Sequence, residues 1–90
     1  MNLFHVAPAD AAKLIEQEGI RGNTDGWGDT VWAWDSLRAA REYAGSKDVI
    51  YKIDSSKYSA EPSNNLPSKS GGMSWGLLGP ICPGDFGLVN

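Results

Sequence analysis

The first 54 residues alternate three short strand patterns with two short helix patterns, and each helix pattern ends at a glycine. The strand patterns span 3–6, 30–34 and 48–54, and the helix patterns span 8–18 and 37–44. Gly19 and Gly45 follow the helices, and a glycine ends a helix readily because it adopts the left-handed conformation. This alternation favours an α+β fold, which we predict to be a small split antiparallel β-sheet with two helices packed on it.

Each of the two helix patterns carries one apolar face. Pro8 suits the first turn of the first helix, where its missing N–H is not needed. Ser36, preceded by Asp35, is a favourable N-cap for the second helix. The residues expected to face the core are Ala11, Leu14 and Ile15 in the first helix, and Leu37, Ala40, Tyr43 and Ala44 in the second.

The rest of the chain has a different composition. Residues 55–74 are rich in serine and contain two prolines and two glycines, which is typical of a flexible surface loop. Two further short strands are expected at 75–81 and 85–89, so the last segment should join the sheet. A length of 90 residues predicts one domain, spanning 1–90.

Charge and composition exclude several classes of function. A net charge of −3, with the basic residues dispersed, argues against nucleic acid as a partner, because phosphate binding needs a basic surface. The chain has no run of about 18 apolar residues and no secretory signal, so we expect a cytoplasmic protein with no membrane partner. One cysteine, Cys82, and one histidine, His5, among scattered aspartates predict no metal site.

Four tryptophans are a large share of so short a chain. Trp32 and Trp34 alternate along the second strand pattern, so both project with Thr30 from the same face of that strand. Trp27 lies in the glycine-rich segment 22–28, where a large side chain is harder to bury. Tryptophan is common in cores and in ligand pockets alike, so the residues alone leave both roles open for Trp32 and Trp34.

Taken in order, these segments resemble a known family. The string LFHVAP at 3–8, a helix that exits through EGI at 18–20, and TVWAWDS at 30–36 before an alanine-rich helix resemble the ADP-ribosyltransferase superfamily. The resemblance is greatest to the compact bacterial and phage members related to the RNA 2′-phosphotransferases, and it covers residues 3–54 well and 75–89 loosely. It implies that His5 binds the ribose of NAD, and that Thr30, Trp32 or Trp34 contacts the nicotinamide.

The resemblance thus implies a cleft for NAD or a related ADP-ribose-type nucleotide. We expect His5, Trp32 and Trp34 to lie around this cleft, with Trp27 and the 55–74 loop at its rim. Either ring nitrogen of His5 could donate to a ribose hydroxyl, depending on the tautomer. The transferases also use a glutamate on a late strand, whereas the glutamates here stand at 16, 18, 42 and 61. We therefore expect nucleotide binding without robust ADP-ribosyl transfer.

A second hypothesis needs no nucleotide. A small acidic domain encoded by a phage or mobile element could act as an anti-defence inhibitor that binds a bacterial protein partner in the host cytoplasm. A third hypothesis, ranked below these two, is a toxin that modifies a host target. A titration with NAD and ADP-ribose separates the first hypothesis from the second.

Overall fold

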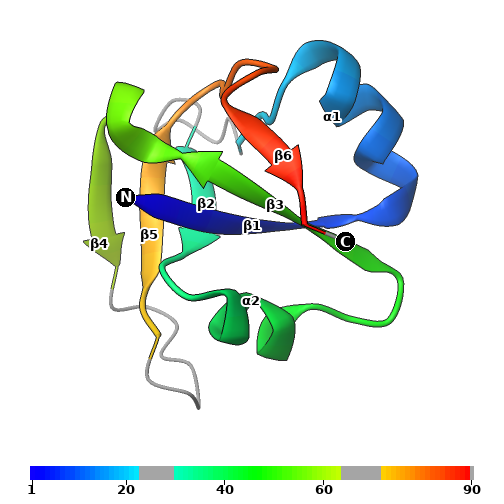
Figure 1. Ribbon diagram of the computed structural model, residues 1–90, viewed down its shortest axis with the longest axis horizontal. Helices are drawn as coiled ribbons and strands as arrows, with labels where there is room; N and C mark the ends of the chain where they lie inside the picture. Colours follow the sequence, from blue (N-terminus) through cyan, green and yellow to red (C-terminus); the bar gives the residue numbers. More distant parts are fainter. Residues whose placement is uncertain (23–29, 64–71, 90) are drawn as a thin grey trace.

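The computed structural model describes residues 1–22, 30–63 and 72–89. In these segments the strands are β1 (Asn2–Pro8), β2 (Thr30–Trp34), β3 (Asp48–Asp54), β4 (Ala60–Ser63), β5 (Ser74–Leu78) and β6 (Phe86–Leu88), and the helices are α1 (Ala12–Glu18) and α2 (Leu37–Tyr43). The strands pair antiparallel in the order β4-β5-β2-β1-β3-β6 (Figure 1). The described segments therefore form a small α+β protein with a six-stranded antiparallel sheet and two helices, which confirms the predicted fold class at that level.

The sheet consists of two three-stranded halves that meet at one residue pair. β1 pairs with β3 along its whole length, from Asn2↔Asp54 to Pro8↔Asp48. β1 and β2, in contrast, are paired only at Phe4↔Trp34. Figure 1 shows β4, β5 and β2 running across the direction of β1 and β3. The sheet is therefore open on one side of the Phe4–Trp34 pair.

Two buried clusters, one on each face of the sheet, form the core. Side chains alternate along β1, so Leu3 and Ala7 face α1 while Phe4 and Val6 face α2. The cluster on the α1 face contains Leu3, Ala7, Ile15, Ile20, Val31, Ala33, Tyr51, Ile53, Leu77 and Ile81. The cluster on the α2 face contains Trp34, Ala39, Ala40 and Ile50. Neither helix of the described segments has the length and apolar character needed to cross a membrane.

The start of the first helix differs from the prediction. Pro8 does not open the helix; it ends β1 opposite Asp48, and a 3₁₀ turn over Ala9–Ala11 precedes α1. The pairing of β1 with β3 holds Pro8 extended, at φ −62° and ψ 142°. The predicted end of the helix is confirmed, since Gly19 has a φ of 94°. A Cβ at Gly19 would lie 2.3 Å from the Ile81 carbonyl oxygen, so a side chain at this position would be strained and crowded.

The inner faces of the helices are only partly as predicted. Ile15 and Ala40 are buried, but Leu14 and Tyr43 are exposed. α2 approaches the sheet through two alanines, Ala39 and Ala40, and this close approach leaves Tyr43 outside, with its ring against Trp34 at 5.8 Å between centroids. The predicted N-cap of α2 is confirmed, because the Ser36 hydroxyl accepts the Ala39 N–H.

The predicted loop over 55–74 contains regular structure. Residues Ser55–Lys57 form a 3₁₀ turn, and β4 follows at Ala60–Ser63 and pairs with β5. Serine and proline made this strand look like a loop, but β4 is an edge strand, where Pro62 is tolerated because one side of the strand needs no partner. Residues 64–71 lie outside the described part of the chain. The strands predicted at 75–81 and 85–89 are confirmed, with shorter bounds, as β5 and β6.

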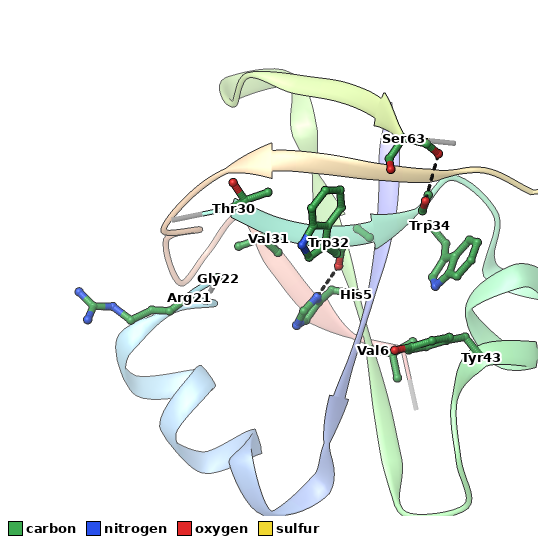
Figure 2. Close-up of a pocket in the computed structure, with 12 residues that line it drawn as sticks. His5, Val6, Arg21, Gly22, Thr30, Val31, Trp32, Trp34, Tyr43 and Ser63 are labelled. Atoms are coloured by element: carbon green, nitrogen blue, oxygen red, sulfur yellow. Dashed lines mark hydrogen bonds between the residues drawn. The ribbon is translucent and has the colours of Figure 1, made fainter. Parts of the chain in front are cut away.

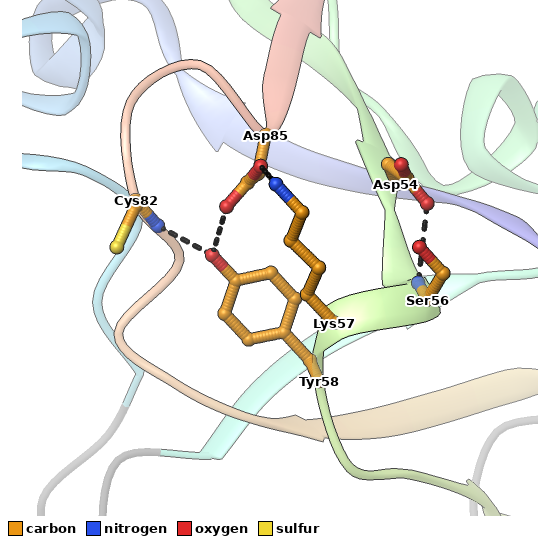
Figure 3. A network of polar contacts seen from close by, with 6 residues as sticks. All are labelled: Asp54, Ser56, Lys57, Tyr58, Cys82 and Asp85. Carbon is orange, nitrogen blue, oxygen red and sulfur yellow. Dashed lines mark hydrogen bonds and ion pairs between the residues drawn. The ribbon is translucent and has the colours of Figure 1, made fainter.

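A polar cluster ties the connection after β3 to the turn before β6 (Figure 3). The Tyr58 hydroxyl donates to Asp85 Oδ2 over 2.6 Å and accepts the Cys82 N–H over 2.9 Å. Lys57 Nζ lies 3.2 Å from Asp85 Oδ1. Burial and the hydrogen bond to Asp85 raise the pKa of Tyr58 to about 12, and the hydrogen bonds from Tyr58 and Lys57 lower the pKa of Asp85.

Acid should weaken this cluster, and Asp85→Asn should remove most of that effect. Because the pKa of Asp85 is lower in the folded chain than its ordinary value of 3.8, its stabilisation is present above that value and is lost as pH falls through the folded pKa. We expect Asp85→Asn to lower the free energy of unfolding at neutral pH and to flatten its decline in acid, as measured by urea unfolding across the acid range. Asp10→Asn, in the exposed turn after β1, is the charge-matched control. Parallel curves for wild type and Asp85→Asn would contradict the prediction.

Candidate functional site

A cavity of about 360 Å³ lies where β1 and β2 separate. We call it the aromatic cavity because Trp32, Trp34 and Tyr43 form much of its wall. The other lining residues are His5, Val6, Arg21, Gly22, Thr30, Val31, Ala33, Ser63 and Ser74 (Figure 2). Its volume falls within the range of roughly 300–1,000 Å³ that is usual for small-molecule sites.

His5 stands in the opening of the sheet and bridges its two halves. Its Nδ1 lies 2.7 Å from the Trp32 carbonyl oxygen. A carbonyl oxygen only accepts hydrogen bonds, so Nδ1 carries the proton and donates. Burial lowers the pKa of His5 from its ordinary value of 6.5, against a smaller opposing effect of this hydrogen bond, so the ring is neutral at pH 7.

The fixed tautomer determines what His5 offers to a ligand. In a neutral ring with a proton on Nδ1, Nε2 has a free lone pair and accepts a hydrogen bond. Figure 2 shows Nε2 directed away from Trp32. The sequence left both nitrogens available as donors; the structure commits Nδ1 to the backbone, so at neutral pH His5 would accept from a ligand hydroxyl rather than donate to it.

The two tryptophans of β2 occupy different environments. Trp32 is 48% exposed, and its ring lies over Gly76, where a Cβ would be 3.2 Å from the ring. Trp34 is only 7% exposed and belongs to the core cluster under α2. Trp32 therefore offers an aromatic face to a ligand, whereas Trp34 is mainly a core residue that also closes one end of the aromatic cavity.

Arg21 provides the charge at the aromatic cavity. Among the described residues that line it, Arg21 carries the one formal charge at neutral pH, and its side chain is exposed. Thr30, Ser63 and Ser74 contribute hydroxyl groups, and the Ser74 hydroxyl donates to the Ser63 carbonyl over 3.1 Å. This combination of an aromatic wall, one cation and several hydroxyls suits a planar ligand that carries an anionic group.

The structure brings most of the expected site residues together. His5, Thr30, Trp32 and Trp34 all line the aromatic cavity. Trp27 lies outside the described residues, so its expected place at the rim stays a prediction. Sequence reasoning missed Arg21 and Tyr43 as lining residues, whereas Ser63 and Ser74 belong to the 55–74 segment that it expected at the rim. A usable signal existed for Arg21, because it follows directly after the helix exit at Gly19-Ile20 and so comes back towards the sheet.

Glu61 is placed by β4 on the same face of the sheet as Trp32. It pairs with Gly76, which in turn pairs with Trp32, and residues directly opposite in antiparallel strands project to the same side. Glu61 is exposed and is not among the lining residues of the aromatic cavity. Within the described segments no three His, Cys, Asp or Glu side chains gather closely enough to hold a metal ion.

Comparisons with protein-family models, with curated proteins and with solved structures find no match to this chain.

Proposed function

We propose that the aromatic cavity binds NAD or a related nucleotide of the ADP-ribose type. The observation that carries this proposal is the fixed state of His5, which leaves Nε2 as a hydrogen-bond acceptor on a residue that lines the same cavity as the half-exposed Trp32. A ribose carries hydroxyl donors next to a planar base, and that is the pairing of groups which these two side chains complement. The sequence resemblance, independent of the geometry, points to the same ligand class.

Each part of such a nucleotide has a matching group in the proposed site. A base or nicotinamide ring stacked on Trp32 would gain roughly 1–3 kcal/mol, by analogy with bases stacked on aromatic side chains. A ribose hydroxyl would donate to His5 Nε2. Arg21 would pair with a phosphate, for which the planar guanidinium is well suited. The bound nucleotide would thus span from the exposed aromatic face to the cation.

On this proposal the protein binds the nucleotide but does not robustly transfer its ADP-ribose. Cleavage of the bond to nicotinamide is helped by a carboxylate beside the ribose, and the described lining residues include no carboxylate. Glu61 lies on the Trp32 face of β4, outside the lining of the cavity. Its exposure on an edge strand favours a role at the rim.

Calorimetric titration with NAD and with ADP-ribose tests the proposal. We expect saturable binding, and we expect Arg21→Gln to weaken it by about three- to tenfold because a charge-assisted hydrogen bond to phosphate is lost. Arg38→Gln removes the same charge from the exposed side of α2 and should leave the affinity unchanged.

Two results would overturn this proposal or part of it. Absence of heat with both nucleotides would remove the nucleotide hypothesis and favour the alternative, an anti-defence inhibitor that binds a bacterial protein. Strong labelling of a lysate by the protein with labelled NAD would contradict the absence of robust transfer. Loss of that labelling in Glu61→Ala would then identify Glu61 as the acid, and labelling that survives would point to another group.

A further inference from the structure

A second hollow, separate from the aromatic cavity, has a buried polar atom in its wall. Tyr51 on β3 is 1% exposed, and its hydroxyl has no hydrogen-bond partner among the described residues. A buried hydroxyl left without a partner costs free energy, so a tyrosine is an expensive choice where phenylalanine would fill the same space. The hydroxyl is therefore the feature of this region that calls for a ligand.

The hollow has a volume of about 240 Å³ and lies between α1 and β6, which Figure 1 shows on the same side of the molecule. It shares no lining residue with the aromatic cavity. Glu16 on α1 supplies the one formal charge among its described lining residues. Burial, and to a smaller extent the negative charge of Glu16, raises the pKa of Tyr51. The remaining wall is apolar or glycine and includes Pro83, Phe86 and Leu88.

We propose that this hollow binds a primary alkylammonium group, such as a free alkylamine or a lysyl side chain. The ammonium would donate to the Tyr51 hydroxyl oxygen and to the Glu16 carboxylate, and so satisfy the buried oxygen and neutralise the charge. The attached methylene groups would lie along Pro83, Phe86 and Leu88, as the stem of a lysine does on apolar surfaces.

Other ligand classes fit this hollow less well. An anion would face the negative charge of Glu16 with no cation among the described lining residues to offset it. A divalent metal ion needs several oxygen ligands, and Glu16 is a single carboxylate. A wholly apolar ligand would leave the Tyr51 hydroxyl without a partner. An ammonium group avoids all three problems: it is attracted by the charge of Glu16, it needs only one carboxylate, and it donates a hydrogen bond to the Tyr51 hydroxyl.

The proposal is tested by titrating the protein with n-pentylamine at neutral pH. Binding is measured from the NMR shifts of the Gly84, Gly87 and Leu88 amides. We expect saturable shifts, and we expect Glu16→Gln and Tyr51→Phe each to weaken binding by about tenfold, because the first removes the charge that pairs with the ammonium and the second removes an acceptor. Glu18→Gln makes the same charge change two residues along α1, at a residue that lines neither this hollow nor the aromatic cavity, and should leave binding unchanged. The neutral analogue 1-pentanol should not bind.

Tyr51→Phe also separates the ligand role from a structural one. Without ligand this variant should be as stable as wild type or more stable, because it removes a buried hydroxyl that has no partner in the described part of the chain. N-acetyl-lysine methylamide, titrated in parallel, distinguishes a lysyl side chain from a free amine by which of the two binds more tightly. Absence of saturable shifts with both amines, equal binding of 1-pentanol, or equal weakening by Glu18→Gln would overturn the proposal.

Discussion

Replacement of Trp34 by alanine is expected to lower the free energy of unfolding by about 3–5 kcal/mol. The indole is 7% exposed and packs with Ala39, Ala40 and Ile50 beneath α2. Its removal would leave a large void between β2 and α2, because these small alanines hold the helix close to the sheet and offer no side chain to fill the space. Small domains have total stabilities of about 5–15 kcal/mol, so this variant should be close to unfolding at room temperature.

Trp32→Ala should reduce nucleotide affinity strongly and reduce the stability of the fold only a little. Because about half of the Trp32 surface is already in water, we expect a loss of at most about 1–2 kcal/mol of stability. Nucleotide affinity should fall by more than tenfold, that is by more than about 1.4 kcal/mol, since the stacking face is lost. Trp32→Phe, which keeps an aromatic face, is the control and should retain most of the affinity.

Urea unfolding and calorimetry on the same preparations measure both quantities. If Trp32→Ala destabilised the fold as much as Trp34→Ala, both indoles would be core residues and the binding role of Trp32 would be lost. If Trp34→Ala lowered the free energy of unfolding only slightly, the described packing of α2 over Trp34 would be contradicted.

Strand period alone did not distinguish these two tryptophans, because they differ in what packs over them. Both project from the same face of β2, as alternation requires. Trp34, however, lies one residue before the turn at Asp35-Ser36 that leads into α2, so the helix folds back over it. Trp32 lies about 7 Å further back along the strand, where β1 has already separated from β2 and the Trp32 side chain is half-exposed. Coverage by a neighbouring element is a tertiary property that no window of sequence contains.

Local signals predicted most elements well. β3 has the expected bounds, 48–54, because four of its seven residues are apolar or aromatic strand formers and charged residues mark both ends. Gly19 and Ser36 ended and began their helices as expected, since a positive φ and an N-cap hydroxyl act over one or two residues. What these signals share is that the physical cause lies within the same few residues as the pattern.

Elements that depend on distant partners were missed. β4 is a strand because it pairs with β5 across the chain, although its own residues, AEPS, have poor strand propensity. Pro8 remains in β1 because Asp48 pairs with it. Tyr43 reaches the aromatic cavity from the end of α2, and only the packing of that helix decides where its side chain points. The four residues that the sequence placed in the site and the structure describes all came from strands, where the period of two is reliable.

A comparably large effect on binding is expected from His5. His5→Ala removes both the Nε2 acceptor and the bridge from Nδ1 to the Trp32 carbonyl. We expect nucleotide affinity to fall by at least about tenfold, with a loss of stability of only about 0.5–1.5 kcal/mol for the hydrogen bond. His5→Asn separates these two roles, because an asparagine amide N–H can donate to the Trp32 carbonyl from the position of Nδ1 but offers no group at the position of Nε2. This variant should therefore keep the stability and lose the affinity.

The titration of His5 provides an independent check, and it can be followed directly because the chain has a single histidine. NMR of the ring should show a proton on Nδ1 and none on Nε2 at neutral pH, and a pKa below 6.5. With the folded pKa lowered, the unfolded chain binds the proton more readily. The contribution of neutral His5 to stability is therefore complete above pH 6.5 and is lost as pH falls through the folded pKa. His5→Asn should lack this loss in mild acid. A ring pKa at or above 6.5, or a proton on Nε2 in the neutral ring, would contradict the tautomer on which the proposed ribose contact depends.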